Sequence, residues 1–165
     1  MLTLICPWPI SANKYWRPVH IGKHITIVPT KEAKAYREDI ARGARMAGLR
    51  TPIAGRVRVA IELYPQRPQD WVNRARLKPF GWDDDVRCID LDNATKVLFD
   101  ALKGVAFGDD KFVFEYSAKR MEPDGEARVV VRIEPIALPA VPELPMAMPI
   151  PKPQPTKAET LGVPF

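Results

Sequence analysis

Cysteine is scarce in this chain of 165 residues. The two cysteines, Cys6 and Cys88, are too few and too isolated for a disulfide framework or a cysteine-rich metal centre. Cys6 lies within an apolar run, so we expect it to be a small buried hydrophobic side chain. The composition therefore excludes two common ways of stabilising a small domain.

Long apolar runs are also absent. No segment approaches the roughly 18 apolar residues that a membrane span needs. The start of the chain has no positively charged leader region, and prolines interrupt its apolar stretch. We expect a soluble protein in a reducing, cytoplasmic setting, with no membrane partner.

Proline is abundant and unevenly distributed. Nine of the 18 prolines follow Glu134. Residues 135–165 carry little charge and show no hydrophobic period, which predicts a disordered, extended tail. The length leaves room for one ordinary domain before it, which we place at residues 1–134.

Charge divides the chain into two parts. Residues 1–78 carry 15 Lys/Arg against 5 Asp/Glu (+10), residues 79–134 carry 8 against 13 (−5), and the tail carries two of each. This asymmetry favours one surface that attracts a polyanion and one pocket that gathers cations. Two ordinarily solvated surfaces would have the same composition, so charge alone leaves both readings open.

Hydrophobic periodicity predicts an α+β domain with a small mixed sheet and two main helices. Thr30 is a candidate N-cap for the first helix, and Asp92 for the second. The expected elements are a strand at 2–6, a basic loop at 11–29, a helix at 31–48 with an inward stripe that includes Ala47, a strand at 56–64, a long loop at 65–88, a helix at 92–103, and a hairpin formed by strands at 111–120 and 127–134.

Carboxylates gather around the second helix. Asp90 and Asp92 are two residues apart, so their side chains point to the same side if the chain is extended there. Asp110, next to Asp109, can reach the same place from a short loop. Grouped carboxylates repel one another unless they share a cation, and oxygen ligands suit magnesium. Lys96, one turn after Asp92, would add a positive charge for a phosphate group.

A plainer interpretation exists for each of these residues. Asp92 can be only a helix cap, Asp109 and Asp110 only a turn, and Lys96 only a solvated helix residue. The combination with a basic half favours a metal site. Spacing alone does not show that the two acidic segments meet.

Two sets of motifs together resemble the RusA-type Holliday junction resolvases over residues 1–134. Near the start these are Pro7-Trp8-Pro9, Ser11-Ala12-Asn13 and Trp16-Arg17. Later in the chain they are Asp90-x-Asp92-Asn93, Lys96, Asp100-x-Leu102 and Asp109-Asp110.

The resemblance implies a homodimeric endonuclease that resolves four-way DNA junctions by paired symmetric nicks in a bacterial or phage-infected cell. It implies magnesium as the cofactor, for which manganese can substitute. Asp90, Asp92 and Asp110 would be the metal ligands, and Lys96 would complete the catalytic set. The loop at 65–88 is longer than in the family pattern, which puts junction selectivity in question.

Candidate DNA contacts combine positive charge, amide groups and stacking surface. They are Asn13, Lys14, Trp16, Arg17, Arg67, Arg74 and Arg76. A packing role for Trp16 and simple solvation of Arg17 are the alternatives.

The end of the chain is similar to peptides that dock bacterial DNA polymerases and repair proteins onto the sliding clamp. Leu161, Val163 and Phe165 would be the anchoring residues, although Thr160 stands where glutamine is usual. We expect such a tether to raise the local concentration of the nuclease at replication forks.

Two other functions remain open at this point. One is a less selective nuclease that acts on flaps or forks. The other is a non-catalytic junction-binding or clamp-adaptor protein whose acidic cluster is structural.

Overall fold

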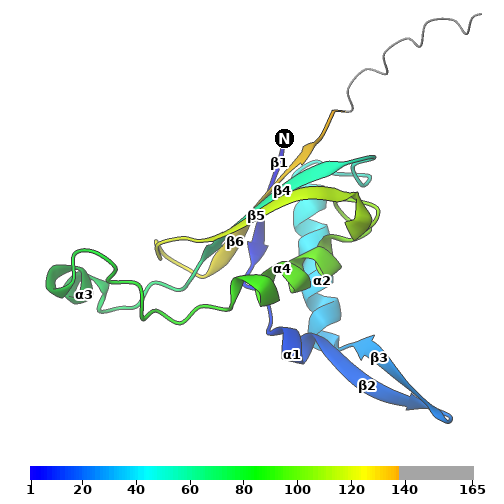
Figure 1. The fold of residues 1–165 in the computed structure, drawn as a ribbon, viewed down its shortest axis with the longest axis horizontal. Helices are drawn as coiled ribbons and strands as arrows, with labels where there is room; N and C mark the ends of the chain where they lie inside the picture. Colours follow the sequence, from blue (N-terminus) through cyan, green and yellow to red (C-terminus); the bar gives the residue numbers. More distant parts are fainter. Residues whose placement is uncertain (138–165) are drawn as a thin grey trace, which may run out of the picture.

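The computed structural model describes residues 1–137. Figure 1 shows β1 (Leu2–Pro7), α1 (Ala12–Tyr15), β2 (Trp16–Ile21), β3 (His24–Pro29), α2 (Lys31–Met46), β4 (Val57–Tyr64), α3 (Trp71–Leu77), α4 (Leu91–Leu102), the 3-10 turn η1 (Asp110–Phe112), β5 (Val113–Arg120) and β6 (Arg128–Pro135). Over this range no helix is long and apolar enough to cross a membrane. The predicted tail lies almost wholly outside the described residues, and so does the proposed clamp-binding peptide.

The main sheet is mixed, as predicted. Its strand order is β1-β6-β4-β5, with β6 antiparallel to both β1 and β4, and β4 parallel to β5. The strict alternation in β4 puts Val57, Val59, Ile61 and Leu63 on the same face of the strand, and all four are fully buried. The α+β prediction and the strand at 56–64 are confirmed.

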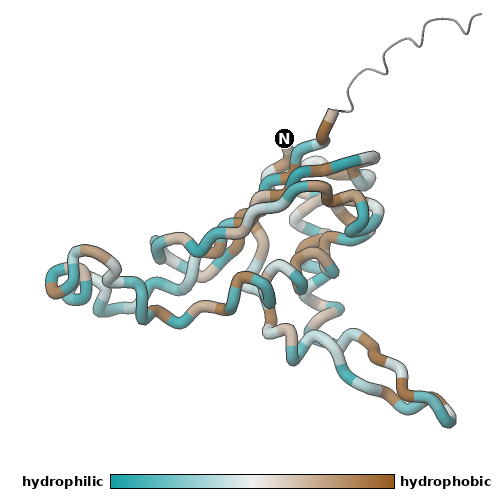
Figure 2. Tube along the Cα trace, in the orientation of Figure 1, coloured by the Kyte–Doolittle hydropathy of each residue, from teal (hydrophilic) through white to brown (hydrophobic). Residues whose placement is uncertain are grey.

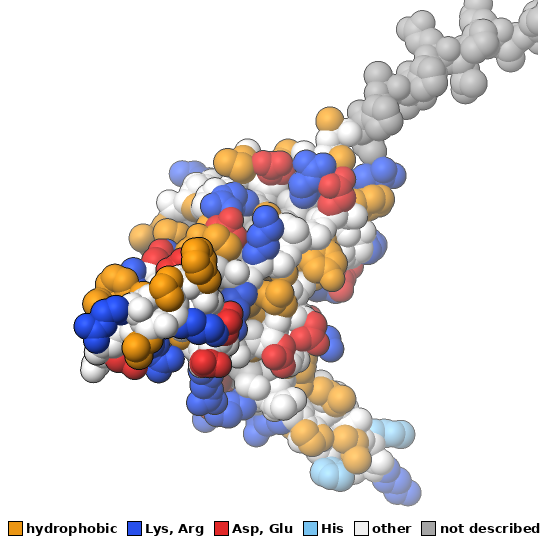
Figure 3. All heavy atoms as spheres, turned by 60° about the vertical axis from the view of Figure 1, so that its left-hand side comes forward, with side chains coloured by type: hydrophobic (Ala, Val, Ile, Leu, Met, Phe, Trp, Pro, Cys, Tyr) orange, Lys and Arg blue, Asp and Glu red, His pale blue; other side chains and the backbone are white. Residues whose placement is uncertain are grey.

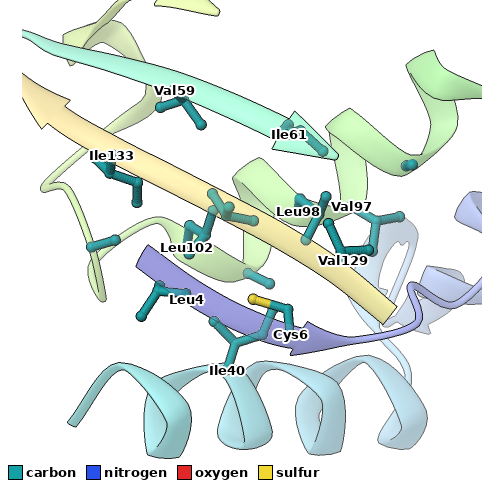
Figure 4. Close-up of a cluster of buried hydrophobic side chains, with 14 of the residues drawn as sticks. Leu4, Cys6, Ile40, Val59, Ile61, Val97, Leu98, Leu102, Val129 and Ile133 are labelled. Atoms are coloured by element: carbon teal, nitrogen blue, oxygen red, sulfur yellow. The ribbon is translucent and has the colours of Figure 1, made fainter. Parts of the chain in front are cut away.

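A single hydrophobic core lies between one face of this sheet and helices α2 and α4 (Figure 4). Ile40 of α2, Leu98 of α4 and Cys6 of β1 meet in it. Burial raises the pKa of the Cys6 thiol to about 12, in agreement with its predicted role as a hydrophobic side chain. The Thr30 N-cap is also confirmed, because its side chain accepts a hydrogen bond from the Ala33 amide at 3.2 Å. Ala47, expected on the buried stripe, is the exposed C-cap residue.

The hairpin predicted from strands 111–120 and 127–134 is wrong. β4 lies between β5 and β6, so the two strands do not pair. The alternating apolar run of β4 gains most from a central position, whereas β5 keeps Phe114 53% and Tyr116 61% exposed at the sheet edge. The Pro-Asp-Gly turn before β6 contacts the 65–88 segment instead, because the Arg67 backbone amide donates a hydrogen bond to the Gly125 carbonyl at 2.9 Å.

The basic loop predicted for residues 11–29 is also wrong. The segment contains α1 and the antiparallel hairpin β2–β3, which turns at Gly22 with a φ of 61°. The β-branched run Ile25 to Val28 is the local signal for its second strand. A left-handed conformation at the turn explains the glycine, because other residues rarely adopt it.

Two elements project from the body (Figure 1). One is the β2–β3 hairpin, and the other is residues 65–88, which we call the arm and which contain α3 within the predicted loop. Both carry exposed apolar side chains, including Ile25 at 65% and Phe80 at 92% exposed. Figure 2 shows hydrophobic stretches in brown along both projections. They stand on different sides of the molecule.

Candidate active site

Helix α4 presents one apolar and one polar stripe. Its buried residues are Ala94, Thr95, Val97, Leu98, Ala101 and Leu102, and all of them except Thr95 belong to the hydrophobic core. On the other side, Asp92, Lys96 and Asp100 follow one another at helical spacing. Packing of the apolar stripe therefore fixes the direction in which the three charged side chains point.

The helix begins one residue earlier than predicted. Asp90, not Asp92, is the N-cap residue, and its carbonyl accepts the first helical hydrogen bond, from Ala94, at 2.9 Å. Its carboxylate caps no backbone amide. Asp92 lies within the first turn, where the helix dipole favours a negative charge.

This earlier start separates the two aspartates. The expectation that both point to the same side required an extended chain through Asp92, whereas Leu91 is already helical. Asp90 lines one cavity beside the helix and Asp92 lines another. The two carboxylates thus flank the beginning of α4.

The cavity beside Asp92, which we call the carboxylate cleft, brings the two acidic segments together. It has a volume of about 290 Å³ and is lined by Asp92, Thr95, Lys96, Phe99, Asp100, Asp110 and Tyr116. Asp110 enters from η1, and Tyr116 comes from the neighbouring β5. Phe99 meets Tyr116 edge to face, with ring centroids 5.5 Å apart, which joins helix and strand at the side of the cleft.

Charged groups in the cleft and beside it shift one another's pKa values. Burial and the nearby Asp110 carboxylate raise the pKa of Asp100, while Lys103 and Lys96 oppose this effect. Lys103 Nζ lies 2.8 Å from Asp109 Oδ2 and 3.3 Å from Asp110 Oδ1. The ammonium group of Lys103 lowers the pKa of Asp109 and its own pKa rises in return.

Asp100 and Lys103 were not among the predicted site residues. Asp100 belongs to the Asp100-x-Leu102 motif and lies one turn after Lys96 on the same stripe, but the sequence assigned it no role. The ion pairs of Lys103 depend on a contact with Asp109 and Asp110 from another segment.

The donor set of the cleft suits a hard cation. Its ligand atoms are carboxylate oxygens, and burial together with the nearby Asp110 charge raises the pKa of Asp100. Within residues 1–137, no three Asp, Glu, His or Cys side chains are close enough to hold an ion by themselves. Magnesium commonly uses only one or two carboxylates together with waters and substrate phosphate, so the residues fit this ion.

The cavity on the other side of the helix start, which we call the Asp90 cavity, has a volume of about 560 Å³. It joins the motifs near the chain start to the Asp90-x-Asp92-Asn93 motif. The residues that line it are Trp8, Pro9, Ser11, Asn13, Gln66, Arg87, Cys88, Ile89, Asp90, Asn93 and Ala127. Asn13, a predicted DNA contact, thus lies beside Asp90.

Comparison with known proteins agrees with these motifs. The family model described as endodeoxyribonuclease RusA matches residues 7–134. The chain belongs to the RusA family. The match includes every residue that lines the two cavities.

Individual RusA relatives match over most of the domain. The crossover junction endodeoxyribonuclease RusA of Escherichia coli K12 is 31% identical over 120 residues, which cover 72% of this chain and 82% of the relative. The protein of the same name from Enterobacteria phage 82 is 32% identical over 116 residues, which cover 70% and 78%. The resemblance and the assignment as an endodeoxyribonuclease are confirmed.

The predicted DNA contacts of this RusA-family enzyme fall into two separate groups. Lys14, Trp16 and Arg17 lie at the base of the β2–β3 hairpin, where Trp16 packs on the buried Tyr15 with ring centroids 4.9 Å apart. Arg74 and Arg76 lie in α3 of the arm, and Arg67 lies near the start of the arm. Figure 3 shows Lys and Arg side chains on both projections and on the body between them.

Two of the arm arginines have partners within the protein. Arg67 donates to the backbone carbonyls of Pro123 and Asp124 and stacks over Trp71, 4.8 Å from the ring centroid. Arg74 pairs with Asp70 at 2.9 Å. Arg67 therefore anchors the base of the arm to the turn before β6.

Proposed function

We propose that the chain is a magnesium-dependent endonuclease that resolves four-way DNA junctions by paired symmetric nicks. The observation that carries the proposal is the carboxylate cleft, in which Asp92, Lys96 and Asp110 converge from two segments of a RusA-family domain. The relatives are named crossover junction endodeoxyribonucleases, which supports the choice of substrate. The proposed setting is the cytoplasm of a bacterial or phage-infected cell.

Asp92 and Asp110 are the proposed metal ligands that line the cleft, and magnesium or manganese is the proposed ion. When bound, the ion supplies Lewis-acid chemistry that activates water near neutral pH and offsets the charge developing on the phosphate. Lys96 directs a positive charge into the same cleft and would bind a non-bridging phosphate oxygen. Asp100 adds negative charge beside the ligands and would strengthen cation binding.

Asp90 is the third proposed ligand, and its position requires a rearrangement. Its carboxylate accepts a long hydrogen bond of 3.3 Å from Asn93 Nδ2 and caps no backbone amide. Few interactions would therefore be lost if the side chain turned across the helix start towards Asp92. In this proposal, Asp90 would complete the ligand set in the complex with DNA and a cation.

The proposed partners are branched DNA, a second copy of the chain and, through Leu161, Val163 and Phe165, the sliding clamp. Asn13, Lys14, Trp16, Arg17, Arg74 and Arg76 are the proposed DNA contacts, and Arg67 supports the arm that carries the last two. A peptide of residues 155–165 tests the clamp contact by titration. Absence of binding at high micromolar concentration would reject it.

Cleavage of a synthetic four-way junction, compared with a flap and a linear duplex, tests the function. With magnesium, we expect ligatable nicks at symmetric positions in the junction and none with a chelator present. Asp92→Asn and Asp90→Asn should each slow cleavage by about a hundredfold or more while junction binding persists. Asp85→Asn, an exposed carboxylate of the arm, is the matched control.

The outcomes separate the alternatives. Equal cleavage of flaps and junctions would indicate a less selective nuclease. Junction binding without cleavage of any substrate, with magnesium or manganese, would reject the enzymatic proposal and favour an adaptor.

A further inference from the structure

The Asp90 cavity is larger than the carboxylate cleft and lies next to it across the start of α4. Its volume of about 560 Å³ falls within the range of small-ligand sites. None of Asp92, Lys96, Asp100 and Asp110 lines it. Asp90 is the one proposed metal ligand that lines it, so the metal chemistry assigns no role to the rest of the cavity.

The lining of this cavity combines a flat apolar wall with polar groups at its edge. Trp8 supplies an indole that is partly buried against the hydrophobic core, and Pro9 supplies a buried proline ring. Ser11, Asn13, Gln66 and Asn93 supply hydroxyl and amide groups. An aromatic face combined with amides is suited to a planar heterocycle.

Several of these polar groups keep hydrogen-bonding capacity for a ligand. The Ser11 side chain occupies an N-cap position but makes no capping bond to α1. Gln66 Oε1 accepts from the Ala127 amide at 3.2 Å, which leaves the amide NH₂ of Gln66 to donate elsewhere. Asn93 uses its NH₂ on Asp90, which leaves its carbonyl oxygen as an acceptor.

The charges and the polarity of the lining exclude two other kinds of ligand. Arg87 is the one Lys or Arg side chain of the lining, so the cavity offers no cluster of positive charge for a phosphate group. A purely apolar ligand would cover the amide and hydroxyl groups of the lining without pairing them, which is unfavourable. A neutral ring with donors and acceptors on its edge satisfies both conditions.

We propose that the Asp90 cavity receives an unpaired nucleobase adjacent to the scissile phosphate. The base stacks on Trp8, and Gln66 and Asn93 bond its edge, while Arg87 at the rim faces the backbone phosphate. This proposal rests on the proposed nuclease function, because Asp90 joins this cavity to the site of cleavage. It makes the cavity the determinant of which bases flank the cut.

A mobile junction, in which many sequences pass through the crossover, tests the proposal through its cleavage positions. Wild-type protein should cut preferentially at particular bases. Gln66→Leu, which keeps the size of the side chain but removes the donor, should reduce the ratio between best and worst sites about tenfold, within the range of one bidentate base contact. Gln69→Leu, an exposed neighbour on the arm, is the matched control and should keep the preference.

A second variant guards against misfolding of the first. Ser11 is exposed and makes no capping bond, so Ser11→Ala should fold normally and also weaken the preference. If wild-type protein cleaves junctions without base preference, or if both variants keep the wild-type preference, the cavity proposal is overturned and the nuclease proposal stands.

A binding measurement separates the two proposals when cleavage is not observed. Calcium replaces magnesium so that the junction is bound without being cut. The fluorescent base 2-aminopurine is placed at one position around the crossover at a time. Binding of wild-type protein should change the fluorescence at one flanking position, and Gln66→Leu and Ser11→Ala should at least halve that change. The same signal without cleavage under magnesium would support the cavity and reject the nuclease. Absence of any position-specific fluorescence change would overturn the cavity proposal.

Discussion

At the scale of single residues, Asp100 tests the electrostatics of the carboxylate cleft. Its raised pKa means that the folded protein disfavours the charged form, so the penalty is present at neutral pH and disappears as the pH falls below the unfolded value. Asp100→Asn should therefore raise the melting temperature of the metal-free protein at pH 7. The side chain is only partly buried, so we expect a rise of about 1–3 °C.

Magnesium provides the second half of this test. A cation in the cleft would offset the same penalty on the charged form of Asp100, so magnesium should stabilise wild-type protein more than Asp100→Asn. Differential scanning calorimetry with and without magnesium measures both effects, and Asp85→Asn is the control. A lower melting temperature for Asp100→Asn without metal would contradict the proposed repulsion.

Asp109 provides the opposite pH dependence. The ammonium group of Lys103 and the Lys111 backbone amide lower its pKa, so the charged form stabilises the fold above the unfolded value of 3.8. This stabilisation is lost as the pH falls through that value towards the lower folded pKa. Asp109→Asn keeps an acceptor for the Lys111 amide but loses the charge. It should be less stable than wild type in urea at pH 7, with the difference shrinking at pH 3. A difference of the same size at both pH values would show that the charge is not its cause.

At the scale of elements, Thr30 connects α1 to α2. It accepts from the Ala33 amide at 3.2 Å, and its hydroxyl donates to the Lys14 carbonyl at 2.8 Å. Thr30→Ala removes both bonds and should lower the free energy of unfolding by about 1–2 kcal/mol. Urea denaturation measures this change, with the exposed loop residue Thr51 as the site of a control Thr→Ala change. An equal loss of unfolding free energy in both variants would show that the Thr30 cap does not stabilise the fold.

Elements with one buried face could be predicted, and elements decided by tertiary contacts could not. α2, β4 and α4 each carry a clear apolar period, because one face packs in the core. The β2–β3 hairpin escaped prediction because most of its residues are exposed on both faces, so its strands lack a clear alternation. The pairing of β5 depends on competition with β4 for the sheet centre, which local turn residues do not reveal.

The candidate site was predicted in part for similar reasons. The motif spacing identified Asp92, Lys96 and Asp110, and the structure gathers them in one cleft. The relation of Asp90 to Asp92 depends on where the helix begins, and a shift of one residue moves a side chain to another face. Lys103 depends on a tertiary contact with η1, so only the folded chain reveals its ion pairs.

At the scale of the whole molecule, the hairpin base and the arm offer two separate basic surfaces to DNA. If Lys14 and Arg17 each contact a phosphate, the double change to alanine should weaken junction binding for all sequences. It should also reduce the slope of log affinity against log salt by about 2. Fluorescence anisotropy at salt concentrations between about 50 and 200 mM measures this slope. Arg50→Ala is the control. An unchanged slope in the double variant would show that Lys14 and Arg17 do not contact DNA phosphates.

Paired nicks demand more than one cleft. Within residues 1–137 each chain has a single carboxylate cleft, whereas a junction presents two opposed strands related by approximate two-fold symmetry. The arm also exposes apolar side chains that a second copy would cover, including Trp71 at 37%, Val72 at 59% and Leu77 at 80%. We therefore expect a homodimer in which each copy cuts one strand.

Mixing active and inactive chains tests this arrangement. With an excess of Asp92→Asn, most active chains would be paired with an inactive copy, so a cruciform plasmid should accumulate nicked circles in place of linear product. An excess of Asp85→Asn should leave the linear product unchanged, because both clefts of each pair remain complete. If the linear fraction with Asp92→Asn matches that of wild type diluted into buffer, single chains make both cuts independently and the two-fold arrangement is wrong.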